Sequence, residues 1–160
     1  ANRKWIGTES GGVFLMSEDG TKQVLQFNVD NSPLLSNTIT SIVIDEITGE
    51  VFFGTDKGII SYRSDATEGG ETNGEIYAFP NPVTPEYDGP IAIKGLVKDA
   101  DVKIADVRGN VVYQTKALGG QAIWTGKNFK GERAATGIYL VFITNEDGTE
   151  TAITKILFVN

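Results

Sequence analysis

The sequence predicts an all-β protein, in which a partial β-propeller of about one and a half blades precedes an immunoglobulin-like β-sandwich of about seven strands. A sequence element recurs at a spacing that suits propeller blades. Short alternating segments, separated by turn residues and without helical periodicity, continue through the rest of the chain. Residues 1–74 carry 11 acidic and 5 basic side chains, whereas residues 75–160 carry 10 and 9. This uneven charge indicates two different domains.

The recurring element is an aromatic residue placed two positions before Gly-Thr. Trp5 precedes Gly7-Thr8, and Phe52 precedes Gly54-Thr55. The two glycines are 47 residues apart, within the range of propeller blades. Because a closed propeller needs about four to eight blades, we expect residues 1–63 to be its C-terminal blades, with the other blades and any signal peptide upstream.

Six strands are predicted in this first half, and turn residues separate them. Glu18-Asp19-Gly20 and Glu46–Gly49 have the composition of hairpin turns. The segment 64–74 is small, polar and rich in glycine, which predicts a linker. The expected strands are near residues 3–7, 13–17, 23–28, 39–45, 50–54 and 58–63.

Seven strands are predicted after the linker, in a domain spanning residues 75–160. Turn residues at Asp106–Asn110 and Asn145–Gly148 suit hairpins within it. Short strands at this spacing predict an immunoglobulin-like sandwich. The expected strands are 75–79, 91–97, 101–107, 110–116, 121–125, 137–144 and 150–159.

Two motifs in this domain have direct structural consequences. The prolines of Pro80-Asn81-Pro82 fix φ and remove two backbone donors, so the chain must leave the first strand extended and turn. Gly137 begins a strand whose alternation places Tyr139 on the same face as Val141 and Ile143. We expect Tyr139 in the core with its hydroxyl at the edge, and Trp124 between the sheets.

Lys155 interrupts the apolar final strand, and two interpretations remain open. A lysine there can prevent an edge strand from pairing with another chain. Alternatively, the secretion machinery or its cleaving enzyme reads this lysine.

The second interpretation follows from a resemblance that covers nearly all of residues 76–160. Ile76–Val83, Trp124–Gly126, Ala135–Val141 and the closing Thr154–Asn160 resemble the C-terminal sorting domain of proteins that Bacteroidetes export by type IX secretion. The resemblance implies an immunoglobulin-like domain that acts as a secretion and surface-attachment signal. The residues that it assigns to the sorting motif are Pro80, Asn81, Pro82, Gly137, Tyr139 and Lys155.

The first half resembles the propeller repeats found beside two-component regulators and in envelope proteins of Bacteroidetes. Its structural positions are Trp5, Gly7, Thr8, Asp45, Gly54 and Thr55. The domain order resembles the propeller-plus-sorting-domain component of the type IX machinery. This implies an exported protein at the outer-membrane surface, or a secreted one, whose partners are the secretion machinery, outer-membrane surface components or anionic lipopolysaccharide.

Composition excludes several other classes. The chain has no cysteine or histidine and a net charge of −7, which removes Cys/His zinc sites and histidine catalysis and disfavours nucleic-acid binding. Asp99 and Asp101 lack the spacing of a calcium loop. No apolar run is long enough to span a membrane. We expect that the protein is not an enzyme and that it binds neither a cofactor nor a metal.

An alternative function is a surface glycan-binding or sensing propeller that the sandwich merely tethers. The basic residues Lys127, Lys130 and Arg133 could then contact an anionic glycan, although a solvated loop is the simpler explanation. Unpaired strands of an incomplete propeller also lead us to expect an edge-to-edge homodimer, or packing of the blade on its own sandwich.

Overall fold

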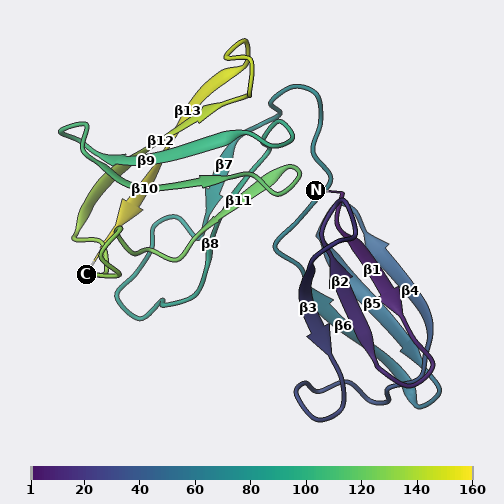
Figure 1. Cartoon of the computed structure of the whole chain (residues 1–160). Helices are drawn as coiled ribbons and strands as arrows, with labels where there is room; N and C mark the ends of the chain where they lie inside the picture. The colour runs from purple at the N-terminus through teal and green to yellow at the C-terminus, as the bar shows by residue number, and fades with distance from the viewer. Residues whose placement is uncertain (1, 160) are drawn as a thin grey trace. The chain divides into compact units, whose positions relative to one another are not determined.

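The computed structural model describes residues 2–159, and its regular secondary structure in that range consists of β-strands only (Figure 1). The chain divides into two compact units, Ala1–Ser64 and Asp65–Asn160. Thirteen strands form four antiparallel sheets in the described range. No helix among these residues is long and apolar enough to cross a membrane. The predicted all-β fold class, a partial propeller followed by a sandwich, is confirmed.

The first unit consists of two three-stranded meanders, with sheet orders β1-β2-β3 and β4-β5-β6. Six strands correspond to one and a half four-stranded blades. All six lie within one residue or so of the ranges expected from the alternating pattern. Their bounds are β1 Lys4–Gly7, β2 Val13–Met16, β3 Gln23–Phe27, β4 Ile39–Asp45, β5 Glu50–Thr55 and β6 Gly58–Arg63.

The Gly-Thr pairs of the repeat close equivalent turns. The Thr8 hydroxyl donates to the carbonyl of Gly12 at 2.9 Å, and the Thr55 hydroxyl donates to the carbonyl of Gly58 at 2.8 Å. Each threonine therefore ties together the two strands that its turn connects. Gly7 has a steric role, because a Cβ there would lie 2.5 Å from the Cγ2 atom of Ile39 in the other sheet.

An aromatic cluster fills the space between the two meanders. The Trp5 ring lies 5.3 Å from that of Phe53, and the Phe27 ring lies 4.8 Å from that of Tyr62. Each pair joins one sheet to the other. Val13 and Phe53 are buried at the centre of this core. The repeat aromatic Trp5 is thus a packing residue between blades.

The second unit is a seven-stranded sandwich, as predicted. A four-stranded sheet in the order β10-β9-β12-β13 faces a three-stranded sheet in the order β11-β8-β7, with one apolar core containing side chains of both. The bounds are β7 Tyr77–Phe79, β8 Ile91–Lys94, β9 Asp101–Asp106, β10 Val111–Lys116, β11 Gln121–Trp124, β12 Gly137–Thr144 and β13 Thr151–Phe158.

The expected linker is part of the second unit from residue 65 onward, where it lies along the sandwich. Thr67 forms a parallel bridge with Gly119, and Gly70 forms one with Val97. The Asn73 side chain accepts a hydrogen bond from the Val97 amide at 2.9 Å. Backbone groups make most of these contacts, so the polar composition of residues 65–74 does not prevent the segment from joining the fold.

Aspartates cap several hairpin turns. The Ser17 and Thr21 hydroxyls donate to the Asp19 carboxylate and lower its pKa to about 2. The Asn110 side-chain and backbone amides lower the pKa of Asp106 in the same way. Both carboxylates are committed to their own turns, as the turn composition predicts.

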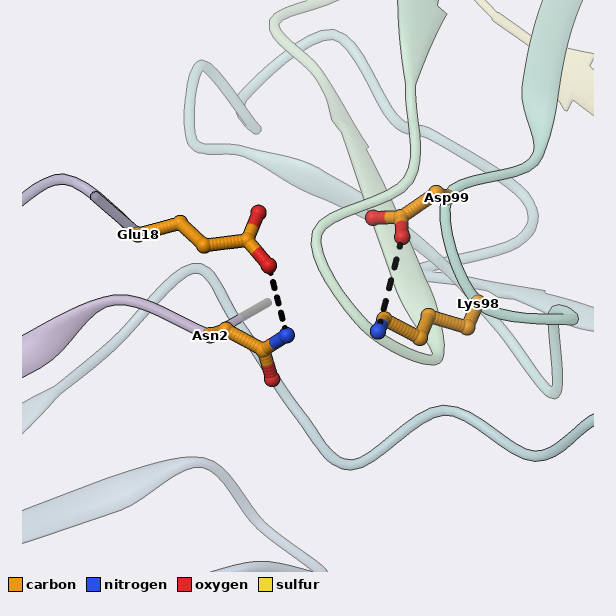
Figure 2. Close-up of polar contacts among 4 residues, drawn as sticks. All are labelled: Asn2, Glu18, Lys98 and Asp99. Atoms are coloured by element: carbon orange, nitrogen blue, oxygen red, sulfur yellow. Dashed lines mark hydrogen bonds and ion pairs between the residues drawn. The ribbon is translucent and has the colours of Figure 1, made fainter.

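Two exposed polar contacts outside the hairpin caps are drawn in Figure 2. In the first unit, the Asn2 side-chain amide donates to the Glu18 carboxylate at 2.7 Å. In the second, the Lys98 ammonium lies 3.9 Å from the Asp99 carboxylate. Asp99 has a φ of 58°, which marks it as a turn residue. Exposed pairs of this kind contribute little to stability.

Candidate functional site

The candidate site is the hairpin of β12 and β13 at the end of the sandwich. The two strands pair along their full length, from Gly137 opposite Phe158 to Thr144 opposite Thr151. Within this register, Lys155 lies opposite Leu140, next to the pair formed by Tyr139 and Ile156. Three of the residues assigned to the sorting motif, Gly137, Tyr139 and Lys155, therefore belong to one hairpin.

The Pro-Asn-Pro motif covers the free edge of β13. The Asn81 amide donates to the Lys155 carbonyl at 3.0 Å, and its oxygen accepts from the Leu157 amide at 2.9 Å. Beyond Pro82, the Val83 amide donates to the Leu157 carbonyl at 2.8 Å, and the Val83 carbonyl accepts from the Val159 amide at 2.9 Å.

This arrangement has a simple chemical basis. Pro80 and Pro82 have no N–H to offer a neighbouring strand, and both of their preceding peptide bonds are cis. The Asn81 side chain has the donor and acceptor of a peptide group, so it can occupy a place in the ladder that the proline backbone cannot. The structure thus brings Pro80, Asn81 and Pro82 together with Lys155, across more than 70 residues of sequence.

Replacing Asn81 with leucine is expected to loosen this edge, because it removes both hydrogen bonds at nearly constant volume. We expect a loss of about 1 kcal/mol in the free energy of unfolding of the sandwich, and faster hydrogen exchange at the Leu157 amide. Asn81→Asp, which keeps the acceptor but not the donor, should retain more protection at Leu157. Unchanged exchange at Leu157 in Asn81→Leu would contradict this role.

Three aromatic side chains hold the hairpin against the opposite sheet. Trp124 is fully buried, and its ring lies 5.5 Å from both the Tyr139 and the Phe158 rings. Its indole N–H donates to the Lys127 carbonyl at 2.8 Å. The Tyr139 hydroxyl donates to the Ala135 carbonyl at 2.9 Å, and burial raises the pKa of this tyrosine. Trp124 and Tyr139 both lie in the core, as predicted from the sequence.

The outward face of the hairpin is apolar and exposed. No function was predicted for this face from the sequence. Ile153 lies opposite Phe142, and Leu157 lies opposite Ile138. All four are partly open to solvent, with Ile153 the most exposed at 64%. Lys155 lies between Ile153 and Leu157 on the same face. An exposed apolar face could have been predicted from the sequence, because both alternating sets of residues in β12 are apolar.

The three basic residues considered for glycan contact lie in one loop with different roles. Arg133 donates to the carbonyls of Thr84 and Tyr87 at 3.1 and 2.9 Å, and its guanidinium carbon is 5.1 Å from the Phe158 ring centroid. This side chain therefore braces the segment before β8. Lys127 pairs with Arg133 through its backbone, and both Lys127 and Lys130 are exposed. Contact with an anionic glycan stays a prediction.

The residues of the propeller repeat occupy structural positions in the first unit. The Asp45 carboxylate accepts from the Thr48 hydroxyl at 2.7 Å and from the Ile47 amide at 3.0 Å, and the Thr48 contact is the main cause of its lowered pKa.

Between residues 2 and 159, no group of three or more potential metal ligands comes together. A hollow of about 360 Å³ in the sandwich is lined by residues that include Asp101, Lys103 and Phe142.

Comparison with known proteins bears on both units. A family model described as the secretion system C-terminal sorting domain matches residues 77–159, from the first residue of β7 to just beyond β13. No curated protein matches the chain.

Among solved structures, the chain is similar to PorZ, described as an essential bacterial surface component of the type IX secretion system of Porphyromonas gingivalis. The two are 32% identical with a TM-score of 0.66, over 99% of this chain and 21% of the other. The chain therefore spans about a fifth of the length of that protein. Since the sorting-domain match extends over more than half of the 160 residues, the chain belongs to the family of proteins that carry a secretion system C-terminal sorting domain.

Proposed function

We propose that the sandwich is the export and surface-attachment signal of a type IX secretion protein, and that the propeller unit is a binding scaffold with an accessory role in that system. Neither unit is proposed to be catalytic. Under this proposal, the protein is exported through the periplasm to the cell surface or secreted, and its partners belong to the secretion machinery.

One observation carries the proposal for the sandwich. The motif at residues 80–82 and the final strand are far apart in sequence, yet Asn81 binds the backbone of Lys155 and Leu157 directly. The family match covers both parts. A partner that contacts the last hairpin would therefore meet a fixed structure, which lowers the entropy cost of recognition. The 32% identity to PorZ across both units supports the accessory role.

The experiment is export of a reporter in a bacterium that has a type IX system. A periplasmic signal peptide and a reporter enzyme are placed before residues 1–160, and surface display is measured with a protease that does not enter the cell. We expect display of the full chain and periplasmic retention of a chain that ends at Asn145. A reporter carrying residues 1–64 alone is the matched control and should also be retained. Normal display of the chain ending at Asn145 would refute the proposal.

Lys155→Glu in the same reporter separates the two interpretations of this lysine. Both side chains are charged, so either one can keep another chain from pairing with this strand. If the lysine only guards the edge, display stays at the wild-type level. If the machinery reads a positive charge here, we expect display to fall at least tenfold while the periplasmic protein remains folded and resistant to proteolysis.

A further inference from the structure

Residues 65–74, which we name the strap, cross one end of the three-stranded sheet of the sandwich. The end of β8 and the start of β11 are neighbours there, because Lys94 lies opposite Gln121. The Thr67 amide donates to the Leu118 carbonyl at 3.2 Å, just before β11 begins. The strap then reaches the segment after β8 and continues into β7. It therefore passes the ends of all three strands of this sheet.

The segment after β8 holds the middle of the strap through backbone amides. The Lys98 amide donates to the Gly70 carbonyl at 3.0 Å, and the Val97 amide donates to the Asn73 side chain at 2.9 Å. Both amides lie beyond the last paired residue of β8, so the sheet itself does not supply their acceptors. The strap supplies them, which ties it to the sandwich at specific positions.

Two glycines allow the strap to lie this close. A Cβ at Gly120 would lie 2.3 Å from the Glu68 carbonyl oxygen, and all three of its nearest atoms belong to the strap. A Cβ at Gly69 would lie 2.7 Å from the carbonyl carbon of Gly119. Neither Gly69 nor Gly120 has a positive φ. The close approach of two backbones, and not an unusual conformation, therefore requires glycine at both positions.

The strap leads directly into β7 and from there to the Pro-Asn-Pro motif. The Gly74 amide donates to the Gly95 carbonyl at 2.9 Å, just before β7 begins. β7 is an edge strand of only three residues, Tyr77–Phe79. Pro80 follows it at once, so the position of β7 determines where Asn81 meets the last strand. A strand this short depends on the contacts that hold its two ends.

We propose that the strap is a positioning element of the sorting domain, which fixes the start of β7 and thereby holds Asn81 on the backbone of Lys155 and Leu157. The strap lies outside residues 77–159, which the family model matches. The folded export signal then begins at the strap and not at β7. This consequence for export rests on the function proposed above, whereas the positioning role does not.

Hydrogen exchange of the whole purified chain tests the positioning role without any export step. Gly120→Ala should displace the strap, because the added methyl group has no other close neighbour. We expect exchange to become about tenfold faster at the Lys98 amide, which the strap accepts, and at the Leu157 amide, which Asn81 accepts. The Val141 amide, in the centre of β12, should exchange at the wild-type rate.

Asn73→Ala tests the same role from the side of the strap. It removes the acceptor of the Val97 amide and adds no bulk, so it leaves the sandwich side of the contact unchanged. We expect a smaller acceleration at both the Lys98 and the Leu157 amides. Thr72→Ala is the matched control, because Thr72 lies in the strap and is exposed. It should leave both exchange rates unchanged.

Three results of the exchange experiment would count against the positioning role. Wild-type exchange at Lys98 in Gly120→Ala would mean that the strap does not hold this amide. Fast exchange at Lys98 with wild-type exchange at Leu157 would mean that the strap docks without positioning the motif. Equal acceleration at Leu157 and Val141 would mean that the whole sandwich has lost stability, and the specific link from strap to motif would be wrong.

The reporter described above tests the consequence for export. Gly120→Ala should lower surface display about threefold or more, since recognition then has to order the motif first, and Thr72→Ala should be displayed as the wild type is. Wild-type display of Gly120→Ala, together with fast exchange at Leu157, would overturn the link between strap and export. Failure of the wild-type chain to reach the surface would instead refute the proposed function, and the exchange experiment would still decide the positioning role.

Discussion

Replacing Trp124 with alanine is expected to lower the free energy of unfolding of the sandwich by about 3–5 kcal/mol. Trp124 has no exposed surface and lies between the two sheets, in ring contact with Tyr139 and Phe158. Truncation leaves a cavity that these neighbours cannot fill, because both are held in β12 and β13. It also leaves the Lys127 carbonyl without its indole donor. A loss of this size is a large part of the stability of an ordinary domain.

Urea denaturation followed by resolved amide signals of the sandwich measures this effect separately from the first unit. Phe79→Ala is the matched control, because Phe79 belongs to the same three-stranded sheet but is 68% exposed. It should cost well under about 1 kcal/mol. A Trp124→Ala variant as stable as Phe79→Ala would show that the hairpin does not depend on this aromatic cluster.

Replacing Gly12 with alanine is expected to be the most damaging small substitution in the first unit. Gly12 has a φ of +80°, and a Cβ there would lie 2.1 Å from the Phe27 carbonyl oxygen. The left-handed backbone alone costs a residue with a side chain about 1–2 kcal/mol. The clash adds to this cost, since the Phe27 backbone belongs to β3 and cannot move without disturbing the sheet. We expect a total loss of at least about 3 kcal/mol.

Gly20→Ala separates the two contributions. Gly20 has nearly the same φ, +74°, but an added Cβ would meet no atom within 4 Å. Its substitution should therefore show only the backbone cost of about 1–2 kcal/mol. Thermal unfolding of the two variants, followed by signals of the first unit, compares them directly. Equal losses at the two positions would mean that β3 yields easily and that the close approach at Gly12 has no importance.

Local patterns predicted much of the fold. Alternation and turn residues located the six strands of the first unit within about a residue, and they predicted seven strands in the sandwich. The burial of Tyr139 and Trp124 followed from the same patterns. The Gly-Thr repeat predicted a recurring unit, and Thr8 and Thr55 form equivalent hydrogen bonds in its two copies. These features depend on neighbours in sequence or on a strict period of two, so a single sequence contains the information.

The role of Asn81 could not be derived in the same way. Its partners are the backbone groups of Lys155 and Leu157, and backbone groups have no sequence identity. The same reason explains why residues 65–74 look like a free linker in composition and yet pair with the sandwich. Arg133 is a third case, because the Thr84 and Tyr87 carbonyls to which it donates are distant in sequence, and the residues next to Arg133 do not indicate them.

By itself, the sequence determined the positions of the strands along the chain, the two different β units and the repeat, and it contains the residues that resemble a sorting motif. Tertiary structure alone decided which apolar face of β12 is covered and which is exposed, as the contrast between buried Val141 and partly exposed Phe142 shows. It also decided that the Pro-Asn-Pro motif closes the edge of the last strand. The physical reason is that burial and edge pairing depend on what lies opposite a residue in space, whereas strand formation depends mainly on the residue and its neighbours along the chain.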